Sequence, residues 1–200
     1  MDSEKQMLLE VKNLSIGFNI DGNYFEAVDN ISFNIKKGEC IGLVGESGCG
    51  KTVSSMATIK LIPSPPAVIK KGEIIFENKN ILKLKNDELR SIRGKDVGVI
   101  FQEPMSSLNP TQVIGEQIAE VLKIHFPDLS KKEIKERVNN LLRKVGIPSS
   151  SERYSSYPHE FSGGMRQRVM IAIAIACNPK LLIADEPTTA LDVTIQAQIL

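Results

Sequence analysis

Apolar and polar side chains alternate along two early segments of the chain, at residues 8–11 and 31–35. This pattern is typical of β-strands that bury one face and expose the other. Asp21-Gly22-Asn23 lies between the two segments and marks a turn, because Gly and Asn tolerate the backbone conformations that tight turns require. We therefore expect an antiparallel sheet near the N-terminus.

Short apolar runs predict further strands at residues 40–44, 72–76, 97–101 and 181–184. The strand at residues 40–44 is expected to be buried. The run at residues 181–184 contains apolar residues only, as is typical of a central parallel strand covered on both faces. Helices are expected at residues 53–61, 113–124, 130–145, 165–177 and 193–200, and residues 86–93 are expected to form a short charged helix or a turn. Ser130 and Glu133 form a capping-box pattern at the start of one of them, and Gly146 follows its end. The chain is therefore predicted to have an α/β fold.

Composition narrows the possible classes of protein. The chain has 200 residues, of which 42% are hydrophobic and 24% charged, as expected for one substantial globular domain. Its formal net charge of +1 predicts no general field for nucleic acid. The sequence contains no apolar run of about 20 residues that would span a membrane, and its polar start lacks a signal core. Three scattered cysteines, Cys40, Cys49 and Cys177, favour reduced thiols over disulfides or a metal cluster.

A phosphate-loop pattern lies between the strand expected at residues 40–44 and the helix that follows it. Its glycines allow a tight loop whose N–H groups face phosphate oxygens, and a helix N-terminus adds a favourable dipole. Lys51 is expected to reach the β- and γ-phosphates, and Thr52 to ligate Mg²⁺. The expected ATP-binding residues are Gly45, Glu46, Ser47, Gly48, Cys49, Gly50, Lys51 and Thr52.

Polar side chains follow two of the predicted strands. Gln102 comes directly after residues 97–101, where its amide oxygen can coordinate Mg²⁺ or orient a water; a solvent-facing glutamine is the alternative. Asp185 and Glu186 directly follow the apolar run at residues 181–184. In parallel sheets this edge faces the ligand, so we expect Asp185 to hold Mg²⁺ and Glu186 to orient or deprotonate the attacking water.

Ser162, Gly163 and Gly164 precede a predicted helix and form a second candidate anion site; a plain N-cap is the alternative. Arg166 and Arg168 add charge there or lie on a solvated helix face. Three early aromatics, Phe18, Tyr24 and Phe25, offer rings that stack on adenine or pack in the core.

These motifs, in this order, resemble the motif set of ABC-transporter ATPase subunits over essentially the whole chain. The resemblance makes them, in turn, a Walker A loop, a Q-loop at Gln102, a signature motif, a Walker B strand with a catalytic Glu186, and a D-loop at Asp192. By spacing, Phe18 occupies the place of the adenine-stacking aromatic. The signature departs from the common form, since Phe161 replaces Leu and Met165 replaces Gln. Its residues are Ser162, Gly163, Gly164 and Met165.

The resemblance implies one ABC ATPase domain with a P-loop NTPase core at about residues 1–102 and 178–200, an N-terminal antiparallel β-subdomain, and a helical subdomain at about residues 103–177. It implies hydrolysis of Mg²⁺-bound ATP, with the signature of one subunit closing on ATP held by Lys51 of the other in a homo- or heterodimer. Residues 101–110 and 157–168 resemble the dipeptide/oligopeptide and nickel importer branch. The implied partners are permease subunits and, indirectly, a solute-binding protein, at the cytoplasmic face of the membrane.

Two parts that the resemblance leads us to expect are missing, the family's switch histidine and the C-terminal extension of the importer branch. The family's switch histidine follows the D-loop, whereas His125 and His159 precede Walker B. The expectation is therefore a C-terminally truncated chain that binds ATP but hydrolyses it weakly.

The rival classes are an importer of nickel or another small solute, a P-loop kinase, a chromosome-maintenance or repair ATPase, and a soluble translation-type ATPase. The kinase leaves Glu186 and the signature unexplained, and the repair ATPase requires long heptad runs between phosphate loop and signature, which this sequence lacks.

Overall fold

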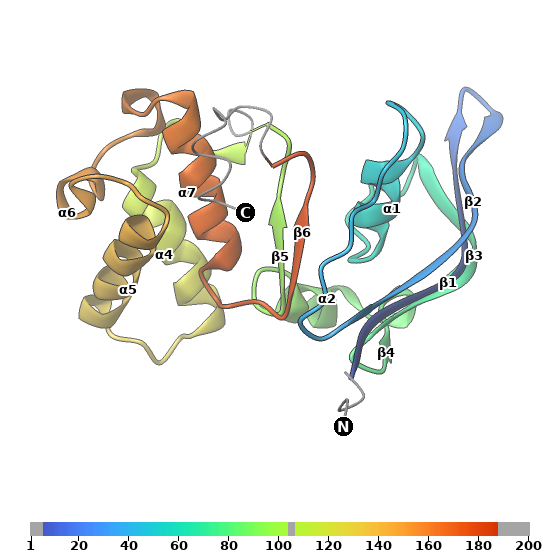
Figure 1. The fold of residues 1–200 in the computed structure, drawn as a ribbon, viewed down its shortest axis with the longest axis horizontal. Coiled ribbons are helices and arrows are strands. Elements are labelled where there is room, and N and C mark those ends of the chain that lie inside the picture. Colours follow the sequence, from blue (N-terminus) through green and yellow to red (C-terminus); the bar gives the residue numbers. More distant parts are fainter. Residues whose placement is uncertain (1–5, 104–106, 188–200) are drawn as a thin grey trace. The chain divides into compact units, whose positions relative to one another are not determined.

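A computed structural model describes residues 6–103 and 107–187 of the chain. The chain divides into two compact units, Met1–Arg90 and Ser91–Leu200, which are described separately. The first unit contains these elements: β1 (Met7–Ile20), β2 (Asn23–Lys36), α1 (Lys51–Ala57), β3 (Ala67–Phe76), β4 (Lys79–Asn80) and the 3-10 helix η1 (Ile81–Lys83) (Figure 1). Helix α2 (Asn86–Ile92) runs across the boundary between the units.

The strands of the first unit form an antiparallel sheet in the order β2-β1-β3-β4. The predicted turn joins β1 to β2, with Asp21 at φ 50° and Gly22 at φ 78°. Two successive residues with positive φ are typical of the hairpin turn whose twist matches that of the flanking strands. The antiparallel sheet expected near the N-terminus is confirmed, and its strands are longer than the predicted segments.

A bulge explains why the alternating pattern underestimated β1. Leu9 and Val11 point into the core, and after the bulge Leu14 and Ile16 do so instead. The register with β2 shifts between Val11 and Leu14, and Asn13 there has φ 46°. Because a bulge adds one residue to a strand, it moves the buried positions from odd to even numbers.

The strand expected at residues 40–44 is absent from the structure. These residues form no ladder with any described strand, and the side chains of Ile41, Leu43 and Val44 are 41%, 47% and 90% exposed. A buried parallel strand needs hydrogen-bonded neighbours. The sheet of the first unit is antiparallel and offers this segment no such partner. The expectation of a short buried strand here is therefore wrong for the structure described.

The second unit combines a parallel strand pair with a group of helices. Its elements are β5 (Val97–Ile100), α4 (Ile114–His125), α5 (Lys131–Lys144), α6 (Ser150–Arg153), the 3-10 helix η2 (Pro158–Glu160), α7 (Gly163–Ile175) and β6 (Leu181–Ala184). Strands β5 and β6 pair in parallel, Val97 with Leu181 and Ile100 with Ala184. Helix α7 packs on β5 and also on α4 and α5 (Figure 1).

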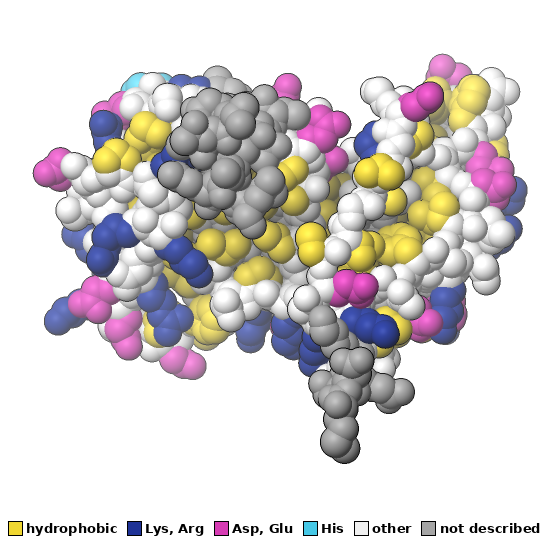
Figure 2. All heavy atoms as spheres, in the orientation of Figure 1, with side chains coloured by type: hydrophobic (Ala, Val, Ile, Leu, Met, Phe, Trp, Pro, Cys, Tyr) yellow, Lys and Arg dark blue, Asp and Glu magenta, His cyan; other side chains and the backbone are white. Residues whose placement is uncertain are grey.

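One apolar cluster holds the helices of the second unit together. Ile118 and Leu122 of α4, Val138 and Leu142 of α5 and Val169 of α7 are all fully buried in it. A large buried aliphatic side chain contributes about 1.5–3 kcal/mol, so this cluster is a main source of stability for the unit. The outer surfaces of these helices carry interspersed positive and negative side chains (Figure 2).

A polar contact links α4 to the segment after α6. Tyr154 Oη donates a hydrogen bond to Glu116 Oε1 at 2.9 Å, and an added Cβ on Gly115 would lie 2.3 Å from the Tyr154 ring. Burial and the contact with Glu116 raise the pKa of Tyr154 to about 12. Hydrogen bonds from Lys123 and then from Tyr154 lower the pKa of Glu116. Glycine at position 115 leaves room for the Tyr154 ring, because a Cβ there would overlap with it.

The segment predicted to form a helix at residues 193–200 lies outside the described residues. Among the helices that the structure does describe, none combines the length and the apolar character needed to cross a membrane.

The capping box predicted for α5 is present, and it gives a test of this unit's stability. Ser130 Oγ accepts from the Glu133 N–H at 3.3 Å, and Glu133 Oε2 accepts from the Ser130 N–H at 2.8 Å. We expect Ser130→Ala to lower the free energy of unfolding by about 1 kcal/mol, because it removes a helix cap. Urea titration checks this. Ser155→Ala, at an exposed serine outside the helices, is the control, and an equal loss in both variants contradicts the prediction.

Candidate functional site

The phosphate-loop segment at residues 45–52 lies in the first unit and leads directly into α1. Gly50 is the N-cap of α1 with φ 89°, and Gly48 has φ 78°. A Cβ added to Gly50 would lie 2.7 Å from the Ala27 carbonyl oxygen of β2. Residues other than glycine rarely adopt these φ values. The path of the loop therefore requires glycine at both positions, and the contact with β2 requires it at Gly50 as well.

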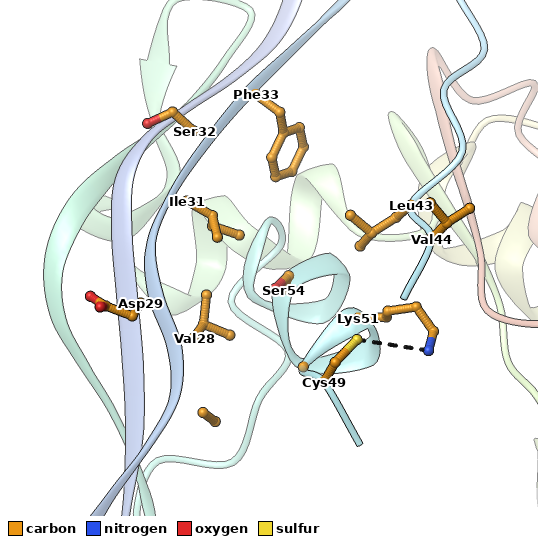
Figure 3. Close-up of a pocket in the computed structure, with 12 residues that line it drawn as sticks. Val28, Asp29, Ile31, Ser32, Phe33, Leu43, Val44, Cys49, Lys51 and Ser54 are labelled. Carbon is orange, nitrogen blue, oxygen red and sulfur yellow. Dashed lines mark hydrogen bonds between the residues drawn. The ribbon is translucent and has the colours of Figure 1, made fainter. Parts of the chain in front are cut away.

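Lys51, the first residue of α1, turns its side chain back over this loop. Its Nζ donates hydrogen bonds to the carbonyl oxygens of Gly45 and Glu46, each at 2.8 Å, and it lies 4.0 Å from Cys49 Sγ (Figure 3). The loop thus holds one ammonium group against its own backbone. Thr52 follows as the exposed second residue of the helix.

A cavity of about 480 Å³ borders the loop inside the first unit. Its walls come from β2, from the exposed segment at residues 40–44 and from the start of α1, with Val28, Phe33, Leu43 and Lys51 among the lining residues (Figure 3). A volume of this size is typical of small-molecule sites. The cavity joins an apolar wall to a cationic group at one end.

The three early aromatics lie on the β1–β2 hairpin. Phe18 is half-buried and pairs across the strands with Phe25, whereas Tyr24 lies over Gly17 with Lys70 Nζ 5.3 Å from its ring centre. None of the three lines the cavity beside the loop. Their possible contact with adenine stays a prediction.

In the second unit, two polar side chains that are far apart in sequence meet beyond the ends of β5 and β6. Gln102 Nε2 donates a hydrogen bond to Glu186 Oε2 at 2.7 Å. The Asp185 N–H donates to the Ile100 carbonyl oxygen at 2.9 Å, which continues the strand pairing up to the residue before Glu186. Glu186 itself has φ 46°, an unusual conformation that costs a non-glycine residue about 1–3 kcal/mol. Such strain is concentrated at functional sites.

The Ser-Gly-Gly segment forms the start of α7. Ser162 is the N-cap and its Oγ accepts from the Met165 N–H at 3.3 Å. Ser162 and Gly163 are exposed, and a Cβ added to Gly163 would meet open space. The backbone at this helix start is therefore accessible from outside, and Gly163 is free of local packing constraints.

The two arginines after this segment make internal contacts. Arg166 Nε donates to the Pro158 carbonyl oxygen at 2.7 Å, and Arg168 Nη1 donates to the Gly146 carbonyl oxygen at 2.7 Å. The sequence predicted that these arginines either add positive charge to the anion site or lie on a solvated helix face. In the structure both side chains also donate hydrogen bonds to backbone carbonyl oxygens. They anchor the loops before α7 to the helix.

Sequence reasoning missed one buried polar residue near this site. Gln167 of α7 is fully buried, and its Nε2 donates to the Pro187 carbonyl oxygen at 2.7 Å. In the sequence Gln167 lies between Arg166 and Arg168, so no local signal distinguished it from a solvated polar residue. Asp192, predicted as the D-loop residue, lies outside the described residues. The described candidates thus form two groups, the loop with Lys51 in the first unit and Gln102, Asp185, Glu186 and the segment from Ser162 to Met165 in the second.

Comparisons with known proteins show which family the chain resembles. A model of the family described as "ABC transporter" matches residues 28–189. The chain is 57% identical over 193 residues to the oligopeptide transport ATP-binding protein OppD of Bacillus subtilis, covering 96% of this chain and 54% of that protein. It is 50% identical over 195 residues to the dipeptide transport ATP-binding protein DppD of the same organism, covering 98% and 58%. The chain thus spans about half the length of these curated relatives.

A solved structure shows the same fold. The ATP-binding cassette MJ0796, solved as a dimer in a post-hydrolysis state bound to ADP and Pi, superposes with a TM-score of 0.86 at 29% identity. The match covers 96% of this chain and 79% of that chain. The predicted α/β class, with an N-terminal antiparallel sheet, a parallel sheet and helices, is confirmed.

The environments of the three cysteines predict different reactivities. Cys49 in the loop and Cys40 before it are exposed, whereas Cys177 is half-buried and burial raises the pKa of its thiol. Because the thiolate is the reactive form, we expect N-ethylmaleimide at neutral pH to label Cys40 and Cys49 well before Cys177. Mass spectrometry of peptides after timed labelling measures the order. Faster labelling of Cys177 than of Cys40, the exposed reference in the same chain, would contradict the described packing.

Proposed function

The chain belongs to the ABC transporter family, and on that premise we propose that it is the ATP-binding and ATP-hydrolysing part of a membrane importer for dipeptides or oligopeptides. The observation that carries the hydrolytic part is the meeting of Gln102 and Glu186 beyond the carboxyl ends of two paired parallel strands, at 2.7 Å. The peptide cargo is supported by the 57% and 50% identity to the two peptide-transport ATP-binding proteins.

ATP is bound through the loop and Lys51. The ammonium group now bonded to the Gly45 and Glu46 carbonyl oxygens exchanges these partners for the β- and γ-phosphate oxygens. Charge-assisted hydrogen bonds to phosphate are stronger than bonds to neutral carbonyls. The exchange is therefore favourable, and it occurs without moving the backbone that Gly48 and Gly50 hold.

Hydrolysis is assigned to the strand ends of the second unit. Glu186 accepts a proton from a water whose oxygen attacks the γ-phosphorus, while the bond from that phosphorus to the β–γ bridging oxygen breaks and ADP leaves with its electrons. Gln102 donates to one carboxylate oxygen of Glu186, and this contact orients the carboxylate that accepts the proton of the water. This hydrogen bond supports an orienting role for Gln102 and a role as base for Glu186.

The described residues offer suitable ligands for magnesium. Mg²⁺ prefers oxygen donors, and Thr52, Gln102 and Asp185 supply a hydroxyl, an amide oxygen and a carboxylate. When bound with ATP, Mg²⁺ neutralises charge that develops on the phosphates. Because the Gln102 amide nitrogen is the atom bonded to Glu186, its oxygen remains available for the metal.

The proposed assembly is a dimer of ATPase subunits joined to a permease at the cytoplasmic face of the membrane. The start of α7, from Ser162 to Met165, of which Ser162 and Gly163 are exposed, provides N–H groups for ATP held by Lys51 of a second subunit. The solved dimeric structure of a 29% identical cassette bound to ADP and Pi supports this pairing. We assign permease docking to the helical region at residues 103–177, whose described residues add no strand to the sheet of the second unit. We assign cargo capture to a separate solute-binding protein.

Substitution of the loop lysine tests nucleotide binding. We expect Lys51→Ala to abolish measurable Mg·ATP binding, because it removes the ammonium group that the loop holds. Lys83→Ala, at an exposed lysine in η1 of the same unit, is the control and keeps the unsubstituted affinity. Fluorescent-nucleotide titration measures both variants. Equal ATP affinity in Lys51→Ala and Lys83→Ala would rule out the assignment of the loop.

Cross-linking tests the docking surface. With Cys40, Cys49 and Cys177 replaced by serine, a new cysteine at exposed Thr111, two residues after Asn109, is expected to capture a permease subunit in membranes. A cysteine at exposed Asn34 of β2 is the matched control and should capture none. Detection uses antibodies to the permease after treatment with a short bifunctional maleimide. Cross-links from position 34 alone would place docking on the antiparallel sheet instead.

A further inference from the structure

Gln167 stands out among the buried residues of the second unit because it is polar. Its side chain is 0% exposed in a helix whose neighbouring buried residues are Val169, Met170 and Ala172. Burying an amide is unfavourable unless it is hydrogen-bonded. Here the Nε2 group donates to the Pro187 carbonyl oxygen at 2.7 Å, while the Oε1 atom finds no partner among the described residues.

This pattern argues against a purely stabilising role. An unsatisfied buried polar atom costs about 1–3 kcal/mol, whereas one ordinary hydrogen bond contributes about 0.5–1.5 kcal/mol. An apolar side chain of the same length would fill the space without an orphaned oxygen. Among the described residues, the hydrogen bond to the Pro187 carbonyl oxygen is the contact that glutamine adds. The role of Gln167 therefore depends on the backbone around Pro187.

Pro187 directly follows Glu186, whose backbone has φ 46°. On the other side of Glu186, the Asp185 N–H is tied to the Ile100 carbonyl oxygen of β5 at 2.9 Å. The strand pair thus holds the backbone at the N–H of Asp185, one residue before Glu186, and Gln167 of α7 holds it at the carbonyl of Pro187, one residue after Glu186. A residue in a strained conformation persists only where its surroundings hold it, and these two bonds hold the residues that precede and follow Glu186 in sequence.

We propose that Gln167 is a positioning residue for ATP hydrolysis, which acts by holding the backbone at Pro187 so that the Glu186 carboxylate stays beside Gln102. This inference rests on the proposed ATPase function. The direction of the carboxylate depends on the backbone at Glu186, and that backbone is anchored on its C-terminal side by the Gln167 amide. Release of the anchor lets Glu186 leave the left-handed conformation and turns its carboxylate away from the Gln102 Nε2 donor.

The same helix also carries the signature segment. Ser162 caps α7 and Gln167 lies five positions later, little more than one turn of about 3.6 residues. A helix moves as one rigid piece over this distance. The exposed start of α7 and the anchor of the glutamate are therefore joined directly, so that nucleotide contacts at the signature act on the Glu186 backbone through Gln167.

Steady-state phosphate release by the intact ATP-binding subunit tests the inference. Gln167→Met keeps the length of the side chain and removes the donor, and we expect kcat to fall about 10²-fold, the effect of a small misplacement of a catalytic group, with the KM for Mg·ATP unchanged. Gln117→Met is the matched control. Gln117 is also buried and donates to the Asn109 and Gln112 carbonyl oxygens at 2.9 and 2.8 Å, but it touches neither Glu186 nor Pro187, and we expect kcat and KM to be unchanged.

A double-mutant cycle separates positioning from general destabilisation. Glu186→Asp lowers kcat by itself, and if Gln167 acts through Glu186, adding Gln167→Met to it has little further effect. Multiplied losses would overturn the inference, as would an unchanged kcat in Gln167→Met or an equal loss in Gln117→Met. If Gln167→Met does not fold, Gln167→Asn, which keeps an amide that is too short to reach Pro187, gives the same test.

The outcomes also separate this inference from the proposed function. If the unsubstituted protein does not release phosphate from Mg·ATP, the ATPase assignment fails and the inference fails with it. If the unsubstituted protein hydrolyses ATP and the Gln167 variants do so equally well, the ATPase assignment stands and only the positioning role of Gln167 is refuted.

Discussion

The parallel pairing of β5 with β6 is the constraint on which the second unit depends. Two parallel neighbours cannot be joined by a tight turn, because the chain must return to the same end of the sheet before it enters the second strand. Here the return contains α4, α5, α6 and α7. The pairing of Ile100 with Ala184 brings both strands to an end at one edge. It therefore places Gln102 and Glu186, each two residues farther on, within 2.7 Å of each other.

In the first unit the equivalent constraint is the path of a short loop against β2. Gly50 approaches the Ala27 carbonyl so closely that a Cβ would lie 2.7 Å away, and its φ of 89° excludes most other residues. This path carries the chain into α1 and sets the place of Lys51. The cationic end of the cavity therefore follows from glycine geometry, which explains why the loop could be found from the sequence by spacing alone.

Much of the fold was predictable where the signal is local. The β1–β2 turn, the Ser130 capping box and the loop glycines depend on a few adjacent residues, and all three appear in the structure as expected. The full length of β1 was missed because its bulge shifts the buried positions from Val11 to Leu14. The strand expected at residues 40–44 failed because an apolar run shows preference for burial but cannot supply a hydrogen-bonded neighbour.

The residues of the candidate site also differ in whether a local signal in the sequence marks them. Lys51 and Glu186 were identified because motif spacing and strand ends mark them, whereas Gln167 was missed because its partner is 20 residues away. Helix α7 packs on β5 as well as on α4 and α5, so apolar residues occur around much of its circumference and no polar stripe marks an outer face. Such a helix cannot rotate about its axis without exposing core residues. The direction of the Gln167 amide relative to Ser162 is consequently fixed by packing, and a contact of this kind follows from tertiary structure rather than from any local pattern.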